Sequence, residues 1–263
     1  MSVRDKLNTK EKYIEIVEQQ KKYIEEWVEK IKSLEEADKK DIQLFKLPNR
    51  EVIQNVCGDI LTYKIDNLIA MYSSGENIGK IKEEYSQVVI AMVCGWDLYK
   101  RYIDMVWMLS IGIMLEIENE AFLKLVKLVE KDNPNDFLID FLISYRIPLW
   151  QGKSNEFKFK RPYQAIQEII SFAQTGKIKS LDRLKKYITK EWYRGHSDTG
   201  WHDAHKSEWN IHTGYWSFES GALVKILGLD DTTLKGLPYY PHDMVHWSDE
   251  KSAPSKRPWT ILD

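Results

Sequence analysis

The sequence predicts an all-α fold, a multi-helix bundle made of two packed helical subdomains. Apolar residues recur at helical spacing along most of the 263 residues, and no stretch sustains the period-two alternation of strands. No Asn-Gly or Asp-Gly turn marks a hairpin, and alternating strand and helix units are absent as well. With 43% hydrophobic and 30% charged residues, the composition is that of a globular protein that can bury a sizeable core.

The first predicted helix follows a start signal at Asn8 and Glu11, which resembles a capping box. This helix has an apolar stripe on one face, and its other face is rich in Glu and Lys. The apolar heptad pattern does not continue past Leu34, which favours a bundle helix over a dimeric coiled coil. The apolar stripe advances in alternating steps of four and three through Tyr13, Val17, Gln20, Ile24, Trp27, Ile31 and Leu34.

The remaining helices are delimited by Gly, Pro and Ser signals. Residues 49–72 form a helix that stops at Ser73-Ser74-Gly75, and residues 78–116 form one long helix in which Gly95 and Gly112 mark bends or close helix packing. Asn133 is the expected N-cap of a helix that begins with Pro134. The further helices are expected at 118–130, 134–145, 162–175, 181–193 and 216–227. We expect two domains, 1–131 and 132–263.

Charge is distributed unevenly along the chain. Residues 1–150 carry 21 basic and 26 acidic side chains, residues 151–190 carry 10 and 3, and residues 191–263 carry 7 and 11, for a net charge of −2. This balance gives no indication of direct nucleic-acid binding. The acidic, aromatic-rich last part suits contact with a basic protein surface, although charge alone favours an ordinary solvated surface.

The two cysteines, Cys57 and Cys94, lie in apolar helical patterns, and we expect them to be buried thiols in a reducing cytoplasm. The charged start of the chain lacks the apolar region of a signal peptide. The most apolar region, 88–117, is interrupted by Asp97, Lys100, Arg101 and Asp104, so no membrane span is predicted.

All six histidines and six of the ten tryptophans lie from Trp192 onward. His202/His205 and His242/His246 have helical spacings that suit metal ligands, and Asp203, Glu208 and Asp243 are the nearby carboxylates. The spacing is not HExxH, and no cysteine is near, so packing against aromatic rings is the favoured interpretation. Glu219 lies on a predicted buried helix, where a carboxylate held by a histidine or arginine is more common than a catalytic base. The sequence therefore predicts no catalytic residue, metal or cofactor.

The segment 214–243 has a clear physical interpretation. Small side chains at Ser220, Gly221 and Ala222 permit close approach of another helix, and Gly228 is placed to end the helix with a positive φ. Asp230 or Asp231 then caps a short turn that contains Leu234. The sequence continues into Tyr239-Tyr240-Pro241-His242-Asp243, in which the prolines restrain the tyrosines.

GYWSFESGALVKILGLDD followed by YYPHD resembles the C-terminal domain of the PoNi-type immunity proteins. The stretch 63–84, with YSSGENI, resembles the N-terminal domain of the same family. His242 stands where tyrosine is more common in the family.

The resemblance implies a cytoplasmic, all-helical, non-enzymatic protein that binds and neutralises a cognate polymorphic toxin, with a DNase domain as the expected partner and no contact with nucleic acid or membrane. A DNase binds phosphates and is expected to be basic. Partner-binding residues are therefore expected among the exposed members of an acidic and aromatic set, while Trp216 and Phe218 belong to the core. The set consists of Asp198, Trp201, Asp203, Glu208, Asp230 and Asp231.

Two alternatives remain open from the sequence. One is a metal-dependent enzyme that uses the histidine cluster, and the other is a helical scaffold or regulator without a toxin partner. The identity of the toxin, the contact surface and the oligomeric state are not predicted.

Overall fold

A computed structural model of the chain describes residues 2–248, except for the side chains of Leu98 and Tyr99. Within this range the protein consists of helices and loops without a strand, which confirms the predicted all-α class. The first half contains α1 (Lys10–Asp38), α2 (Asn49–Ser73), α3 (Ile78–Gly95), α4 (Leu98–Met114) and α5 (Asn119–Asp132). The second half contains α6 (Phe137–Arg146), α7 (Lys160–Tyr163), α8 (Ala165–Thr175), α9 (Lys177–Lys186), a π-helical turn (Tyr187–Trp192), α10 (Tyr193–Gly195), α11 (Phe218–Leu227) and α12 (His242–Val245).

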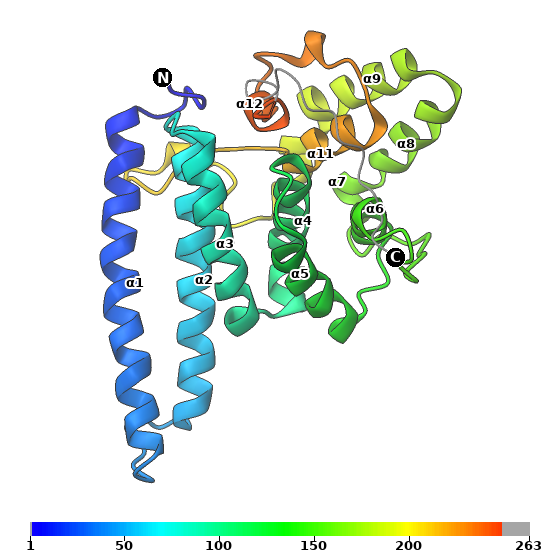
Figure 1. Cartoon of the computed structure of the whole chain (residues 1–263). Coiled ribbons are helices and arrows are strands. Elements are labelled where there is room, and N and C mark those ends of the chain that lie inside the picture. The colour runs from blue at the N-terminus through cyan, green and yellow to red at the C-terminus, as the bar shows by residue number, and fades with distance from the viewer. Residues whose placement is uncertain (1, 249–263) are drawn as a thin grey trace.

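Helices α1 and α2 form a long antiparallel hairpin at one side of the molecule, with α3 next to α2 (Figure 1). The predicted stripe of α1 faces this neighbour, since Tyr13 and Leu34 are buried and the stripe residues between them are partly covered. The start signal was misplaced by one residue, because Thr9 is the N-cap and its hydroxyl accepts a hydrogen bond from the Lys12 amide.

The predicted long helix 78–116 is wrong, because the chain breaks at Trp96 and continues as α4. Trp96 has an extended backbone, and its indole N–H donates to the carboxylate of Asp132 at the end of α5. Gly95 also allows the close packing that was expected, since a Cβ there would lie 2.5 Å from the Cys57 carbonyl oxygen. At Gly112 a Cβ would lie 2.5 Å from the Tyr85 hydroxyl.

The N-cap expected for α6 was also wrong. Asn133 instead ends α5 in the left-handed conformation, and Asp136 caps α6 by accepting from the Ile139 amide. The cysteines differ from the expectation as well: Cys57 and Cys94 form a disulfide between α2 and α3, and Cys94 lies at the surface rather than in the core.

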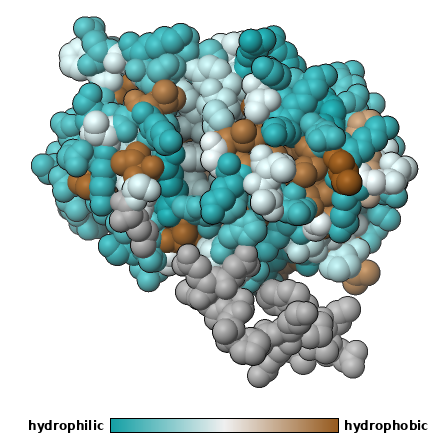
Figure 2. Space-filling model, turned by 90° about the horizontal axis from the view of Figure 1, so that it is seen from above, coloured by the Kyte–Doolittle hydropathy of each residue, from teal (hydrophilic) through white to brown (hydrophobic). Residues whose placement is uncertain are grey.

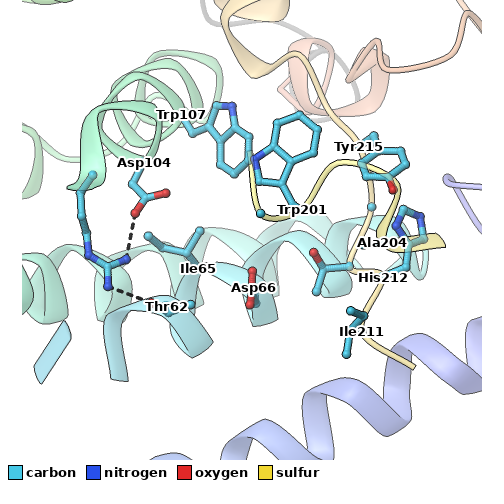
Figure 3. A pocket seen from close by; sticks show the side chains of 14 residues that line it. Thr62, Ile65, Asp66, Asp104, Trp107, Trp201, Ala204, Ile211, His212 and Tyr215 are labelled. Atoms are coloured by element: carbon cyan, nitrogen blue, oxygen red, sulfur yellow. Dashed lines mark hydrogen bonds and ion pairs between the residues drawn. The ribbon is translucent and has the colours of Figure 1, made fainter. Parts of the chain in front are cut away.

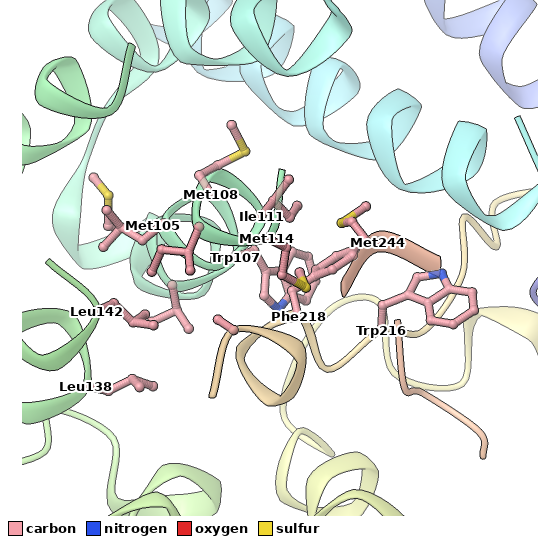
Figure 4. Close-up of a cluster of buried hydrophobic side chains, with 14 of the residues drawn as sticks. Met105, Trp107, Met108, Ile111, Met114, Leu138, Leu142, Trp216, Phe218 and Met244 are labelled. Atoms are coloured by element: carbon pink, nitrogen blue, oxygen red, sulfur yellow. The ribbon is translucent and has the colours of Figure 1, made fainter. Parts of the chain in front are cut away.

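Helix α4 is the centre of the core (Figure 4). Its buried Met105, Trp107, Met108 and Met114 lie among side chains of α6, α11 and α12 (Figure 4). One continuous cluster of buried hydrophobic residues extends from Leu61 to Val245, so the two halves pack against each other around a shared core. No helix among residues 2–248 has both the length and the apolar character that a bilayer crossing requires. The domain boundary near residue 131 stays a prediction, and residues 249–263 of the predicted second domain lie outside the described range.

Candidate functional site

Residues 196–217, which we call the bridging segment, connect α10 to α11 by a route across the molecule. The segment leaves the second half, runs along α1 and α2, and returns to α11 (Figure 1). The Asn210 amide donates to the Lys12 carbonyl oxygen at 3.0 Å, and the Ser73 hydroxyl donates to the Thr213 carbonyl oxygen at 2.7 Å. His212 pairs with Asp5 at 2.8 Å in the interior. These contacts fix the segment on the hairpin although it has almost no regular structure.

The bridging segment presents an acidic and aromatic outer surface. Asp198 and Glu208 are exposed, and the side chain of Trp209 is 73% exposed beside Glu208. Ile211, two residues further on, is 56% exposed. A large indole in water is costly in the free protein, and tryptophan is frequent among residues that dominate binding energy. The sequence prediction missed Trp209, because no helical periodicity there distinguishes an exposed tryptophan from a core one.

The six residues predicted to bind a partner are not brought together at one place. Asp198, Trp201, Asp203 and Glu208 belong to the bridging segment, whereas Asp230 and Asp231 follow α11. Asp198, Glu208 and Asp230 are exposed, as expected for contact residues. Asp203 is partly covered and has a left-handed backbone; its carboxylate accepts from the Tyr193 hydroxyl and pairs with Lys206, which holds the pKa of the Asp203 carboxyl below its ordinary value.

Two members of this set have structural contacts instead. Trp201 is half-buried and stacks on Trp192 with ring centroids 5.6 Å apart. Asp231 is only 5% exposed, so its assignment to an exposed contact surface is wrong. Its carboxylate accepts hydrogen bonds from the Tyr240 hydroxyl and from His246 Nε2, the latter at 2.9 Å. The Asp231 side chain thus anchors the YYPHD stretch to the end of α11.

Asp231, His242 and His246 form the one group among the described residues whose geometry could hold a metal ion, with candidate ligand atoms within 4.8 Å of one another. The sequence had paired the two histidines with Asp243 instead. Asp231 is already engaged by two donors, and the two imidazole rings lie 4.5 Å apart. These contacts give the group a structural role without an ion.

The other histidines also pack against aromatic residues or accept hydrogen bonds. His196 is buried between Tyr163 and Trp192, and burial lowers its pKa to about 4. His202 stacks on Tyr193 at 4.3 Å, and His205 contacts the Tyr215 hydroxyl. The two rings thus pack against tyrosines, which is the arrangement that the sequence favoured.

Glu219 is fully buried, as the sequence predicted, but neither histidine nor arginine holds it. One carboxylate oxygen accepts from the hydroxyls of Tyr187 at 2.9 Å and Ser217 at 2.7 Å. Burial raises the pKa of this carboxyl. Its two hydroxyl donors are themselves buried, so Glu219 connects Tyr187 to Ser217 within the core.

A cleft lies between α2, α4 and the inner side of the bridging segment (Figure 3). Its volume is about 370 Å³, which is within the range of small binding sites. Asp66 and Thr62 come from α2, Asp104 and Trp107 from α4, and Trp201 and Tyr215 from the bridging segment. We call this cavity the acidic cleft.

The two carboxylates of the acidic cleft have different partners. Arg101 pairs with Asp104 at 3.0 Å and also donates to the Thr62 hydroxyl at 2.8 Å (Figure 3). Asp66 forms no direct hydrogen bond or ion pair with any residue in the range 2–248. Burial, with a smaller contribution from the charge of Asp104, raises the pKa of the Asp66 carboxyl to about 7, and the opposing effect of Arg101 is included in this value.

Comparison with known families identifies two adjacent matches. Residues 4–127 match the family described as PoNe immunity protein (PoNi), N-terminal, and residues 134–244 match PoNe immunity proteins (PoNi), C-terminal. No curated protein matches the chain. Among solved structures, the crystal structure of protein PA2201 from Pseudomonas aeruginosa is similar over 95% of this chain and 92% of that one, with a TM-score of 0.58 and 15% identity. At this identity the likeness concerns the fold alone.

The two matches occur in chain order and together cover most of the sequence, as the resemblance of the YSSGENI and GYWSFESG segments implied. An immunity protein acts by binding, which excludes the metal-dependent enzyme and the scaffold without a toxin partner. The chain therefore belongs to the PoNi family of immunity proteins against PoNe polymorphic toxins.

Proposed function

We propose that this protein neutralises a DNase-type PoNe toxin by binding a basic surface of the toxin with the outer face of its bridging segment. The observation that carries this proposal is the exposure of Trp209 beside Glu208 on a segment whose hydrogen bonds to Lys12, Ser73 and Tyr193 fix it to both halves of the molecule. A DNase surface that accepts phosphates is positively charged, and acidic side chains around an aromatic anchor complement it.

The character of one face of the molecule supports an electrostatic mode of recognition. The face seen from above in Figure 2 is largely hydrophilic, with hydrophobic residues in separate small patches. On that face, exposed apolar residues form no broad continuous surface of the kind found in permanent assemblies. Asp198 and Glu208 are the charged contacts proposed in the bridging segment, whereas the Asp203 carboxylate is engaged by Tyr193 and Lys206. Asp230 stays a proposed contact at the end of α11.

The test begins with co-expression of the toxin domain and the immunity protein. We expect growth to be rescued, and purified immunity protein to stop plasmid cleavage by the toxin in a stoichiometric manner. If the immunity protein rescues growth but the free toxin does not cleave DNA, the immunity role is retained and the DNase assignment is overturned. Failure to form a complex with the toxin encoded beside this protein's gene would overturn the proposal as a whole.

The contact surface is tested by Trp209→Ala and Glu208→Lys, with Leu149→Ala as the control. Leu149 is 84% exposed but belongs to the loop after α6 rather than to the bridging segment. We expect each variant in the bridging segment to weaken binding of an inactive toxin domain by about 10-fold or more, as for interface hot spots. The control is expected to retain wild-type affinity, and equal affinity of all three variants would exclude this surface.

We also propose a cytoplasmic location, because a toxin that degrades DNA must be inhibited where the DNA lies. The disulfide between Cys57 and Cys94 is of a kind that is rare in that compartment. Cell fractionation shows whether the protein lies in the cytoplasm or in the periplasm, and alkylation of free thiols before lysis shows whether Cys57 and Cys94 are oxidised there. Recovery of the protein in the periplasm would exclude the cytoplasmic location.

A further inference from the structure

We propose that the acidic cleft receives a basic side chain of the toxin, an arginine or a lysine, and that Asp66 is its anchor. This inference rests on the proposed function and adds to it a second contact, on the inner side of the bridging segment. Ile211 connects the two contacts, because it lines the cleft and is 56% exposed.

The first argument is charge. Asp66 and Asp104 face the cleft with one guanidinium between them, and that guanidinium is engaged by Asp104, Thr62 and the Gly58 carbonyl oxygen. The Asp66 carboxylate is partly exposed to the cleft, yet no group among the described residues donates a hydrogen bond to it. An entering cation would give Asp66 the partner that it lacks, and the charges in the cleft would then balance.

The second argument is the chemistry of the walls. Trp107 and Trp201 lie with ring centroids 5.9 Å apart and face α2 across the cavity (Figure 3). Indole faces attract cations, and guanidinium groups stack on them well. A cavity of about 370 Å³ accommodates a long side chain but not a folded element of the partner. The combination of aromatic walls and an unpaired carboxylate favours a single long cationic side chain.

Two other surface cavities lack this combination. In the cavity next to the YYPHD stretch, about 610 Å³ in volume, Arg4 pairs with Asp243 at 2.7 Å and Asp5 pairs with His212. The cavity beside α7 to α9 contains more basic than acidic side chains, and its Glu168 pairs with Arg183 at 2.6 Å. A basic toxin is repelled from the second of these and finds no unpaired carboxylate in the first.

The acidic cleft is lined by residues from both halves of the chain, so one side chain of the toxin can contact both. Thr62 to Trp107 belong to the part of the chain that matches the N-terminal family domain, and Gly200 to Tyr215 belong to the C-terminal match. A side chain in the acidic cleft therefore contacts both halves, and its binding stabilises the way they pack.

The experiment compares Asp66→Asn with Asp59→Asn in the full-length protein, using an inactive PoNe toxin domain as the ligand. Asp59 is an exposed carboxylate on the same helix and lies outside the cleft lining. We expect Asp66→Asn to weaken the complex about 10- to 100-fold, as for loss of a charge-assisted hydrogen bond, and Asp59→Asn to change it less than about 3-fold. Thermal unfolding of both variants verifies that they are folded.

The toxin side chain that enters the acidic cleft is identified by double-mutant cycles between Asp66→Asn and alanine substitutions of each arginine and lysine on the toxin surface. We expect one basic residue whose substitution no longer weakens binding once Asp66 is neutral. If the wild-type protein does not bind the toxin, the proposed function fails. If it binds and Asp66→Asn binds equally well, or if no basic residue of the toxin is coupled to Asp66, the proposed function stands and this inference is overturned.

Discussion

At the scale of the residue, the raised pKa of the Asp66 carboxyl implies a cost to the stability of the folded protein. Its carboxyl is charged above about pH 4 in an unfolded chain, whereas burial raises its pKa to about 7 in the folded protein. A group with a raised carboxyl pKa destabilises the folded state once the pH rises above the unfolded value, and the full cost is reached above the folded value. Asp66 therefore contributes an unfavourable free energy at neutral pH that is absent in acid.

We expect Asp66→Asn to increase the free energy of unfolding by about 1–3 kcal/mol at pH 8, less than the full linkage value because the side chain is partly exposed. Near pH 4 the gain is expected to be small. Denaturant unfolding at both pH values measures the difference, with Asp59→Asn as the control. A variant that is less stable at pH 8 would show that Asp66 has a stabilising partner.

Asp231 is the opposite case, a carboxylate whose hydrogen bonds are made within the folded chain. Because Asp231→Ala leaves the Tyr240 hydroxyl without its acceptor in the interior and removes one partner of His246, we expect a loss of about 2–4 kcal/mol in unfolding free energy. The adjacent, exposed Asp230→Ala is the matched control and is expected to cost less than about 1 kcal/mol. Toxin affinity measured where both variants are folded should be unaffected by the Asp231 change. Normal stability with weak toxin binding would restore Asp231 to the contact surface.

At the scale of the element, the bridging segment holds its position through a few close contacts rather than through regular structure. Gly214 has a φ of +123°, and a Cβ there would lie 1.9 Å from the Ser73 hydroxyl oxygen. That hydroxyl donates to Thr213 and accepts from the Trp216 indole at 2.9 Å. A side chain at residue 214 must therefore displace the segment from α2.

We expect Gly214→Ala to lower the free energy of unfolding by about 2–4 kcal/mol, because it combines backbone strain with a steric overlap. It should also increase hydrogen exchange at amides 208–214 and weaken toxin binding. Gly200→Ala is the matched control in the same segment, since nothing lies within 4 Å of its added Cβ. If Gly214→Ala is as stable as the control and exchanges no faster, the close contact does not hold the segment.

At the scale of the whole molecule, the acidic cleft links toxin binding to pH. The titratable and charged groups that face Asp66 are Asp104 and Arg101 of α4 and His212 and Tyr215 of the bridging segment. A bound cation favours the charged form of Asp66, so protons compete with the toxin side chain below the free pKa of about 7.

We therefore expect the affinity for the toxin to fall as the pH is lowered from 8 to 6, by up to about 10-fold per pH unit below the pKa. Calorimetry in buffers of different ionisation enthalpy measures the proton release that accompanies binding near pH 7. In Asp66→Asn this component should disappear, while any contribution from His212 or from the toxin is retained. An identical pH profile for the variant and the wild type would show that Asp66 does not titrate on binding.

Local patterns predicted the helices well where a helix is long and amphipathic. The stripe from Tyr13 to Leu34 and the stop at Gly228, with its φ of +59°, were both predicted from neighbours a few residues apart. The sequence marked a bend or close packing at Gly95 but not the full break at Trp96, because the hydrogen bond from the Trp96 indole to Asp132 joins residues 36 positions apart and leaves no periodic signal. Trp209 was missed for a related reason: exposure depends on what lies opposite a residue in space.

By itself the sequence determined the all-α class, the positions of most helices and the family, because helical periodicity, caps and the GYWSFESG and YYPHD motifs are all local properties of the chain. Only the tertiary structure decided which acidic residues are available for contact with a toxin. It buried Asp231, exposed Glu208 and Trp209, and placed Asp66 opposite a bridging segment about 140 residues further along the chain. Burial and the partners of a charge depend on long-range packing, and these determine whether a carboxylate stabilises the fold or remains available for a basic toxin.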